Sequence, residues 1–278
     1  MRLQINIYII LWLLLCMISC VKEEDFYSTE TENMEQVSIE LFTRLRSFDT
    51  PVSRAIALED DVDKAPWILV FTGGDGTAGN AVFAEAAQAN INVGNKSYVL
   101  LRPQSGKSWV LILANPQDKF YVGSMSYDFS VDNFNDLFTN KTLTNVTALL
   151  SAMPMTAGVV VNAPPFVNKM LPMSYLYEAT EGINVNTKIG TSTVPLELTR
   201  SVAKIVVKST VADFTLSGIH SVYNMNKNTV LHNFSGNLET AASMVDYIRN
   251  DANEDFVSAT ANVTDPIYVY EAKSGTGA

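Results

Sequence analysis

Apolar and polar residues alternate between Val37 and Leu45, and this alternation predicts a β-strand with one buried face. A period of two residues places every second side chain on the same side of a strand. One side carries four apolar residues and a threonine: Val37, Ile39, Leu41, Thr43 and Leu45. The other side carries polar residues, namely Ser38, Glu40 and Arg44. We therefore expect the first set to point into a core.

Further apolar runs predict that most of the chain forms β-strands. Trp67–Phe71 is apolar throughout, and Ser97–Leu101 and Trp109–Asn115 flank a turn, which predicts a hairpin. The longest run is Pro195–Lys208, whose phase shifts near Arg200 and so indicates a bulge. Shorter apolar segments complete the pattern: Thr156–Val161, Leu171–Tyr177, Thr215–Tyr223 and Ile267–Tyr270.

Two segments have helical features. Asn80–Gln88 is rich in alanine, glutamate and glutamine, which have high helix propensity. Within Val131–Leu149, Phe134, Leu137 and Phe138 lie at helical spacing, so a short helix packed on a sheet is expected. Many short strands with a few helices predict an all-β fold with minor helices, and a β-sandwich is the best class.

A polar segment between the first two predicted strands contains a single arginine at a Ser-Arg-Ala step. Ser47–Arg54 is rich in residues that break regular structure, and an acidic turn follows at Glu59–Asp63. An extended, accessible backbone with arginine is what a trypsin-like protease needs, so Arg54 and Ala55 are a candidate cleavage site. The alternative is an ordinary loop that happens to contain arginine.

The first residues have the features of an exported lipoprotein. A short positive start at Met1–Arg2 precedes the apolar run Ile7–Ile18, which has the length of a signal-peptide core. The run ends in Met17–Cys20, which resembles the lipobox of bacterial lipoproteins, with Met17 where leucine is commoner. We therefore expect residues 1–19 to be a signal peptide and Cys20 to carry lipid. An ordinary signal peptide with a stray cysteine is the alternative.

Composition limits the possible functions. The net charge of −10 and the isoelectric point near 4.7 argue against a nucleic-acid partner, which needs a basic face. After the leader is removed, Cys20 is the only cysteine, so neither a disulfide framework nor a thiolate metal cluster is expected. No second apolar run is long enough to cross a membrane, so the lipid would be the only anchor.

Several chemical motifs are incomplete. Gly74–Gly79 matches G-x-G-x-x-G, but the next strand ends without the acidic residue that a dinucleotide site requires, so a flexible loop is expected. His220 and His232 are the only histidines and lack carboxylates at metal-ligand spacing. Glu59–Asp63 lacks the glycine and final glutamate of an EF-hand. We expect no metal, no cofactor and no catalytic residues, and therefore not an enzyme.

Four features together resemble the FimA-type fimbrillins, the family of major fimbrial subunits of Bacteroidetes. Their order along the chain supports the resemblance more than any one of them, and the similarity runs from about Cys20 to Tyr270. The features are the leader ending at Cys20, Ser53–Ala55 with its acidic residues and the strand Trp67–Phe71, the hairpin ending at Val110–Asn115, and Leu198–Val207. The acidic stretch Val21–Asp25 resembles the signal that exports Bacteroidetes lipoproteins to the outer face of the outer membrane.

The resemblance implies two transthyretin-like β-sandwich domains and polymerisation by donor-strand exchange. An Arg-specific surface protease would cut after Arg54, with Arg44 and Arg46 as fallback sites. The first strand would leave as an edge strand with its lipid, and a strand from another fimbrial subunit would fill the groove. The implied groove fillers are Val37, Ile39, Leu41 and Leu45. The implied division of the chain is a signal peptide at 1–19, a lipidated leader with the first strand and cleavable linker at 20–54, an N-terminal domain at 55–194 and a C-terminal domain at 195–278.

The chain departs from the family at its C-terminal end. It stops at Lys273–Ala278, soon after the apolar strand Ile267–Tyr270, so we expect the second domain to be incomplete. Either the sequence is a fragment, which we favour, or the subunit accepts a strand without donating one. A non-polymerising surface lipoprotein that binds glycan or host protein is the alternative function. Its ligand face would be aromatic: Tyr121, Tyr127, Phe129, Phe134 and Phe138.

Overall fold

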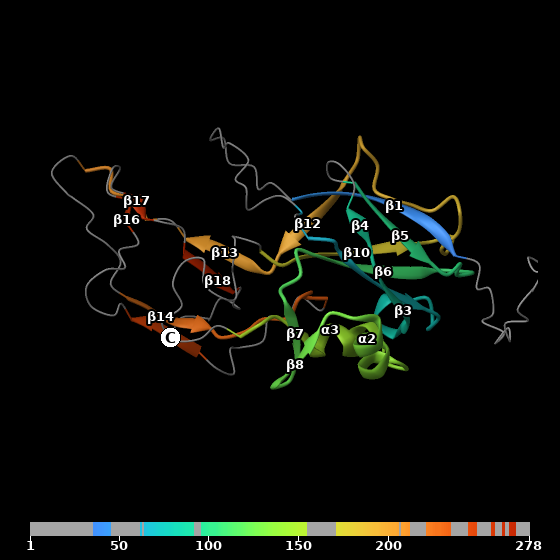
Figure 1. The fold of residues 1–278 in the computed structure, drawn as a ribbon, viewed down its shortest axis with the longest axis horizontal. Coiled ribbons are helices and arrows are strands. Elements are labelled where there is room, and N and C mark those ends of the chain that lie inside the picture. The colour runs from blue at the N-terminus through green and yellow to red at the C-terminus, as the bar shows by residue number, and fades with distance from the viewer. Residues whose placement is uncertain are drawn as a thin grey trace, which may run out of the picture. The chain divides into compact units, whose positions relative to one another are not determined.

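The computed structural model describes residues 36–45, 62, 64–91, 96–154, 171–205, 207–211, 221–234, 244–248, 257–258, 263–264 and 267–270. All of them belong to one compact unit, Gln36–Ala278. They form β-strands with two short α-helices, so the predicted all-β fold with minor helices is confirmed (Figure 1). Among these residues, none of the helices has the length and apolar character needed to cross a membrane.

A five-stranded antiparallel sheet, here called the central sheet, is buried on both faces. Its strands lie in the order β3 (Val82–Gln88), β2 (Trp67–Thr72), β6 (Ser108–Ala114), β10 (Met173–Ala179) and β12 (Leu196–Arg200). Every residue of β6 is buried, and so are the first five of β2. Because both faces are covered, these two strands have continuous apolar runs instead of alternation.

A second group of strands covers one face of the central sheet. It contains β1 (Val37–Leu45), β5 (Lys96–Leu101), β4 (Asn90–Ile91) and β11 (Lys188–Ile189), and β1 also pairs with β12 of the central sheet. Inward side chains of β1 and β5 share an apolar core with β2, β6 and β10. The two layers form the β-sandwich that the strand pattern predicts.

Helices and short strands cover the other face of the central sheet. The helices are α2 (Val131–Phe138) and α3 (Leu143–Leu149), and each is capped by a hydroxyl, from Ser130 and Thr142 respectively. The strands are β7 (Lys119–Val122), β8 (Met125–Asp128) and β9 (Leu150–Ser151). The helix predicted within 131–149 is therefore confirmed, in the form of two helices.

The last described strands form three small pairs. They are β13 (Val202–Ile205) with β18 (Ile267–Tyr270), β14 (Ser221–Asn226) with β15 (Met244–Ile248), and β16 (Val257–Ser258) with β17 (Val263–Thr264). Val202, Tyr268 and Tyr270 belong to the same core as Phe120 and the helices. The Tyr270 hydroxyl lies 3.0 Å from Nε2 of Gln117, which donates to it.

Two local predictions are wrong. Asn80–Gln88 is not helical, because Val82–Gln88 pairs with β2, and sheet pairing outweighs the helix propensity of the segment. The strands Ser97–Leu101 and Trp109–Asn115 exist, but they do not form a hairpin. Strand β5 pairs with β1 and β4, whereas β6 pairs with β2 and β10.

The predicted bulge near Arg200 is a change of sheet. Strand β12 ends at Arg200 in the central sheet, and β13 begins at Val202 in the pair with β18. Ser201 lies between them and is buried, with its backbone N–H donating to the carbonyl of Pro172 at 3.0 Å. The phase shift in the sequence is therefore real, but the strand is interrupted rather than bulged. The predicted segment Thr156–Val161 lies outside the described residues, as does Thr215–Tyr223 before Ser221.

Candidate functional site

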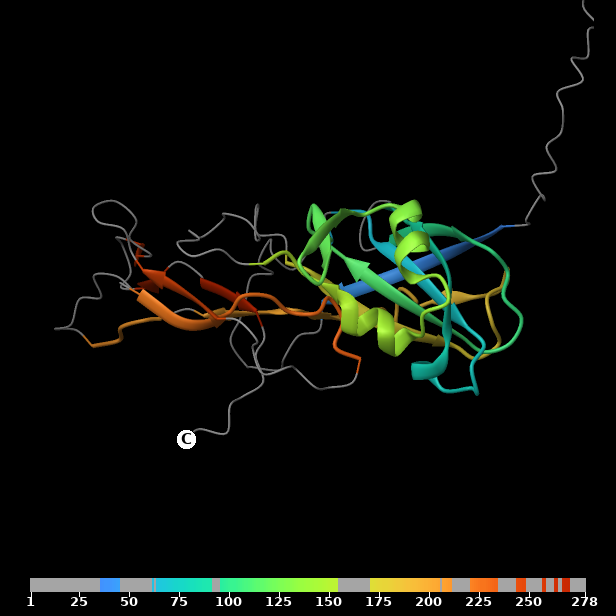
Figure 2. The same ribbon diagram turned by 90° about the horizontal axis from the view of Figure 1, so that it is seen from below.

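Strand β1 occupies the interior of a sheet. Residues Val37–Phe42 pair antiparallel with Leu101–Lys96 of β5. On its other side, β1 runs parallel to β11 at Glu40 and Leu41 and to β12 from Thr43 to Leu45. The expectation of an edge strand is therefore wrong, because β1 has hydrogen-bonded neighbours on both sides. Figure 2 shows β1 as the blue strand that crosses the sandwich. We call the space that β1 fills, between β5 and the pair β11 and β12, the β1 slot.

The inward side chains of β1 are fully part of the core. Val37 is 5% exposed, and Ile39 and Leu41 are 0% exposed. Burying an aliphatic side chain of this size contributes about 1.5–3 kcal/mol relative to leaving it in water. The alternation predicted that these three side chains are buried, and they are, whereas their role as groove fillers stays a prediction. Of Leu45, only the backbone is described, and it pairs with Leu198.

Loss of β1 would uncover both apolar surface and backbone. The floor of the β1 slot is lined by Ile68 and Val70 of β2 and by Val110 and Ile112 of β6, all of them 0% exposed in the presence of β1. The facing edges of β5, β11 and β12 would lose their hydrogen-bond partners together. Unpaired strand edges are ready templates for another strand, so we expect an empty β1 slot to bind a β-strand.

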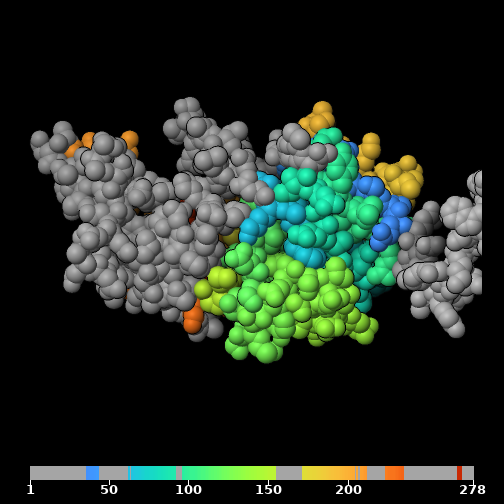
Figure 3. All heavy atoms as spheres, in the orientation of Figure 1, coloured from blue at the N-terminus to red at the C-terminus, as the bar shows by residue number. Residues whose placement is uncertain are grey.

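The outward side of β1 carries a charged cluster. The carboxylate of Glu40 accepts from Lys96 Nζ at 2.7 Å and from the Tyr98 hydroxyl at 2.9 Å. Hydrogen bonds donated by Lys96 and then by Tyr98 to the charged carboxylate lower the pKa of Glu40. The bond that Lys96 donates to Glu40 also raises the pKa of Lys96. Lys96 Nζ also lies 4.6 Å from the centre of the Phe42 ring. Blue atoms of β1 reach the surface in Figure 3.

Gly190 shapes one wall of the β1 slot. Its φ is +74°, and a Cβ placed on it would lie 2.6 Å from the carbonyl oxygen of Phe42 and 3.1 Å from the amide nitrogen of Leu196. Only glycine combines this backbone conformation with so close an approach. Gly190 therefore allows the chain to leave β11 directly beside β1.

The other predicted processing residues lie outside the described part of the chain. They are Cys20, Arg46, Arg54 and Ala55, and of Arg44 only the backbone is described. Arg102, in contrast, is held by Glu85, which accepts from the Arg102 backbone N–H at 2.9 Å and from its Nε at 3.2 Å. The loop Gly74–Gly79 joins the antiparallel strands β2 and β3, whereas a dinucleotide site needs a parallel βαβ unit.

The aromatic residues considered as a ligand face are mainly structural. Phe134 and Phe138 are 0% exposed and pack with Phe120, whose ring stacks on that of Phe134 at 5.0 Å between centroids. The ring of Tyr127 also stacks on that of Phe120, with 5.6 Å between the centroids. Phe134 and Phe138 therefore fill the core under the helices and cannot contact a ligand, whereas Tyr121, Tyr127 and Phe129 are half-buried.

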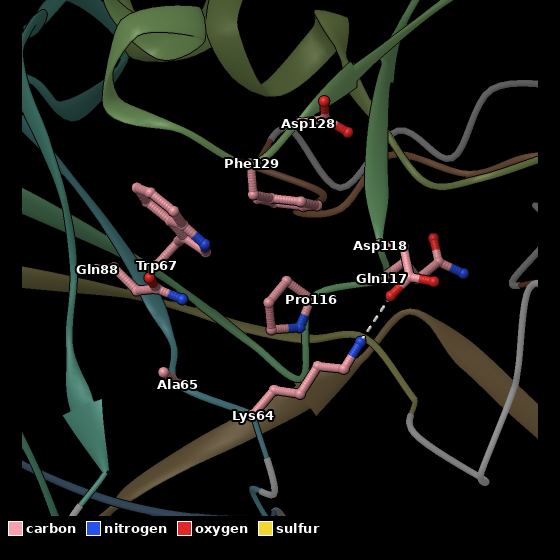
Figure 4. A pocket seen from close by; sticks show the side chains of 9 residues that line it. All are labelled: Lys64, Ala65, Trp67, Gln88, Pro116, Gln117, Asp118, Asp128 and Phe129. Atoms are coloured by element: carbon pink, nitrogen blue, oxygen red, sulfur yellow. Dashed lines mark hydrogen bonds and ion pairs between the residues drawn. The ribbon is translucent and has the colours of Figure 1, made fainter.

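A small pocket lies where β2 begins. Its volume is about 300 Å³, at the lower end of the range for small-ligand sites. Figure 4 shows the residues that line it: Lys64, Ala65, Trp67, Gln88, Pro116, Gln117, Asp118, Asp128 and Phe129. Lys64 Nζ donates to Asp118 at 3.0 Å across its mouth. The pocket thus combines apolar ring surfaces with an amide and charged groups at the rim.

Comparison with known proteins gives matches only among solved structures. No family model and no curated protein matches the chain. A protein from Parabacteroides distasonis described as a candidate cell adhesion protein is 13% identical and has a TM-score of 0.52, and the match covers 87% of this chain and 72% of that one. The two proteins share a fold. The β-sandwich fold expected from the sequence is thus supported by an independent structure.

Two fimbrial proteins of Porphyromonas gingivalis overlap less well. A tip fimbrial protein with a C-terminal truncation is 18% identical with a TM-score of 0.44, and the match covers 86% of this chain and 70% of that one. A fimbrilin is 14% identical with a TM-score of 0.46, and the match covers 88% and 68% respectively.

Proposed function

We propose that this protein is a structural subunit of a cell-surface fimbrium that supports adhesion. It is exported as a lipoprotein precursor and assembled by proteolytic removal of β1 followed by donor-strand exchange. The observation that carries the proposal is the position of β1. The first described strand of the chain fills an interior position of the sandwich, so a single cut behind it separates it from the body without dividing the rest of the chain.

The proposed assembly has three steps. Lipid on Cys20 anchors the precursor in the outer membrane, and an Arg-specific surface protease then cuts between Arg54 and Ala55. Strand β1 leaves with the lipidated leader, 20–54, and opens the β1 slot. A strand from another fimbrial subunit enters the slot, buries its apolar side chains on β2 and β6, and restores the backbone hydrogen bonds. The body then runs from residue 55 to residue 278, as the proposed domains 55–194 and 195–278, and the second of these contributes β12 to the central sheet.

A second candidate function is suggested by the pocket beside β2. A non-polymerising surface lipoprotein would bind a small ligand there, and a single sugar of a glycan suits the mixture of Trp67, Phe129 and the amide of Gln88. Calorimetric titration of monosaccharides would detect such binding. Trp67→Ala would disturb the core, so Gln88→Ala, at an exposed position, is the variant that should remove it.

Limited digestion with an Arg-specific protease tests the proposed function. We expect a new N-terminus at Ala55 and a body that stays folded, because Arg102 is held by Glu85 and Arg200 lies within β12. On the cell surface, the wild-type protein should give SDS-resistant ladders on a gel, whereas Arg54→Ala should remain lipid-anchored and monomeric. Arg102→Ala is the control for digestion and should leave the first cut unchanged.

The proposal would be overturned by a first cut at Arg102 or Arg200, or by a body that unfolds as soon as Arg54 is cut. It would also be overturned if Arg54→Ala gave the same ladders as the wild type.

A further inference from the structure

Beside Glu40, the outward rim of the β1 slot carries two lysines, in a chain whose net charge is −10. Lys96 comes from β5 on one side of the slot, and Lys188 comes from β11 on the other. Both contribute to the electrostatic lowering of the pKa of Glu40, which lies between them. The two lysines on either side of β1 therefore make the local charge positive, although the chain as a whole is negatively charged.

The register brings three residues to one carboxylate. Glu40 lies directly opposite Tyr98 of β5 and directly opposite Lys188 of β11, and Lys96 lies diagonally across on β5. The two β5 residues bind the carboxylate at 2.7 Å and 2.9 Å. We call Lys96, Tyr98 and Lys188 the slot latch.

We propose that the slot latch selects the strand that enters the β1 slot. The strand it favours comes from another polypeptide and carries an acidic residue at the outward position between two inward apolar residues, as Glu40 lies between Ile39 and Leu41. This inference rests on the proposed strand exchange and names the partner of the same site.

Charge complementarity supports this choice of partner. When β1 leaves, Lys96 and Lys188 face each other across the open slot without the carboxylate between them. A strand with an acidic residue at this position restores the cluster, whereas a basic residue places a third positive charge between two others. Like charges at neighbouring positions of a sheet are destabilising.

The slot latch also fixes the register of the incoming strand. A slip of one residue would turn the apolar side chains toward solvent, so the loss of apolar burial already disfavours it. A slip of two residues keeps the apolar side chains inward, so apolar burial alone discriminates poorly against it. It would, however, move the acidic side chain away from Lys188 and Tyr98. The slot latch therefore favours the native register over a two-residue slip, which apolar burial alone does not distinguish.

Competition between synthetic strands tests the proposal. The mature full-length chain is cut after Arg54 and mixed with equal amounts of three peptides spanning Gln36–Leu45: the natural one, one with Glu40→Gln and one with Glu40→Lys. Native mass spectrometry then measures how much of each peptide is bound to the body in place of β1. We expect the natural peptide to exceed the Gln peptide by about 2- to 5-fold, the range for a partly exposed ion pair, with a smaller excess in high salt. The Lys peptide should be taken up least.

A reversed latch supplies the matched test. Lys96→Glu with Lys188→Glu in the body should invert the order, so that the Glu40→Lys peptide is taken up most. Lys107→Glu is the control, since Lys107 pairs with Glu178 on β10 and is not part of the latch, and it should leave the order unchanged. A peptide with Ser38→Lys places the same charge opposite Leu100 and should compete like the natural one.

The outcomes separate the two proposals. Preference for the natural peptide that inverts with the reversed latch supports the selection. Equal uptake of the three peptides overturns the selection and leaves strand exchange intact. Failure of every peptide to replace β1 overturns strand exchange and the selection with it.

Discussion

Burial decides the protonation of His232. Its side chain is mostly buried, and Nδ1 lies 2.9 Å from the hydroxyl oxygen of Ser174 on β10. Loss of hydration disfavours the charged imidazolium, which lowers the pKa of His232 from 6.5 to about 4. In the unfolded chain the same side chain titrates near its ordinary value, so folding and protonation of His232 oppose each other.

The stability of the protein should therefore depend on pH between about 6.5 and 4. In that window the unfolded chain binds a proton at residue 232 that the folded chain does not, so the free energy of unfolding falls as the pH falls. Above pH 6.5 both states are neutral at this residue and the effect vanishes. The full difference is up to about 3 kcal/mol. Urea unfolding of the wild type and of His232→Gln at several pH values measures it.

Comparing the wild type with His232→Gln removes the contribution of the carboxylates to the pH dependence, because they titrate in both proteins. We expect the wild type to lose stability relative to His232→Gln as the pH is lowered from 7 to 4. A constant difference across this range would show that His232 is not desolvated in the folded state.

At the residue scale, alternation along β1 was enough to predict which side chains are buried. Val37, Ile39 and Leu41 follow from the period of two alone. The partners of Glu40 were not predictable, because Lys96 lies 56 positions away and the pairing depends on the register of β1 with β5. The hydrogen-bond partners of Glu40 are thus set by the fold, and the residues beside Glu40 in the sequence do not indicate them.

At the scale of elements, β12 and β13 connect the sandwich to the last strands. The first pairs with β1 and β10, and the second pairs with β18. Side chains from β13 and β18 lie in the core that the helices cover, where burial also raises the pKa of Tyr270 well above its usual range. Strands β12, β13 and β18, which all follow Pro195, therefore pair with or pack against residues that precede Pro195.

An isolated piece containing residues 195–278 should not fold stably. It would lack β10 and β1, the neighbours of β12, and the apolar surface under Val202 and Tyr268. Thermal unfolding followed by circular dichroism should show no cooperative transition for this piece, whereas a chain starting at Gln36 should show one. A cooperative transition from the isolated piece would mean that it forms a core of its own.

Element prediction succeeded where burial on one or both faces leaves a strong pattern, as in β1, β2 and β6. It failed for β3, because alanine and glutamine in Val82–Gln88 favour a helix and only pairing with β2 makes the segment a strand. It failed for the connection between β5 and β6, because a turn between two strands does not show that they pair. Both failures concern non-local contacts, which local composition does not encode.

At the scale of the whole molecule, strand exchange requires that β1 can be removed from a folded body. The β1 slot is bounded by strands that are distant in sequence, namely β5, β11 and β12, and its floor is the central sheet. The body therefore keeps its internal pairings when β1 is absent, apart from those made to β1 itself. Such a body is expected to hold an open slot long enough for another strand to enter.

A reversible covalent lock across the β1 slot is the most direct test of this claim. Ser38 and Leu100 lie directly opposite each other on β1 and β5, and both are exposed. Opposite residues of antiparallel strands are close enough for a disulfide, so Ser38→Cys with Leu100→Cys should tie β1 to the body. A chain starting at Val21 contains no other cysteine.

The locked protein is cut after Arg54 and mixed with a heavier, isotope-labelled peptide spanning Gln36–Leu45, and its mass is followed under native conditions. We predict that the oxidised protein keeps its own β1 and takes up none of the labelled peptide, and that adding a reductant starts the exchange. Ser38→Cys alone should exchange with or without reductant. Uptake of the labelled peptide by the oxidised protein, or no uptake after reduction, would contradict the claim that β1 leaves its slot to make way for another strand.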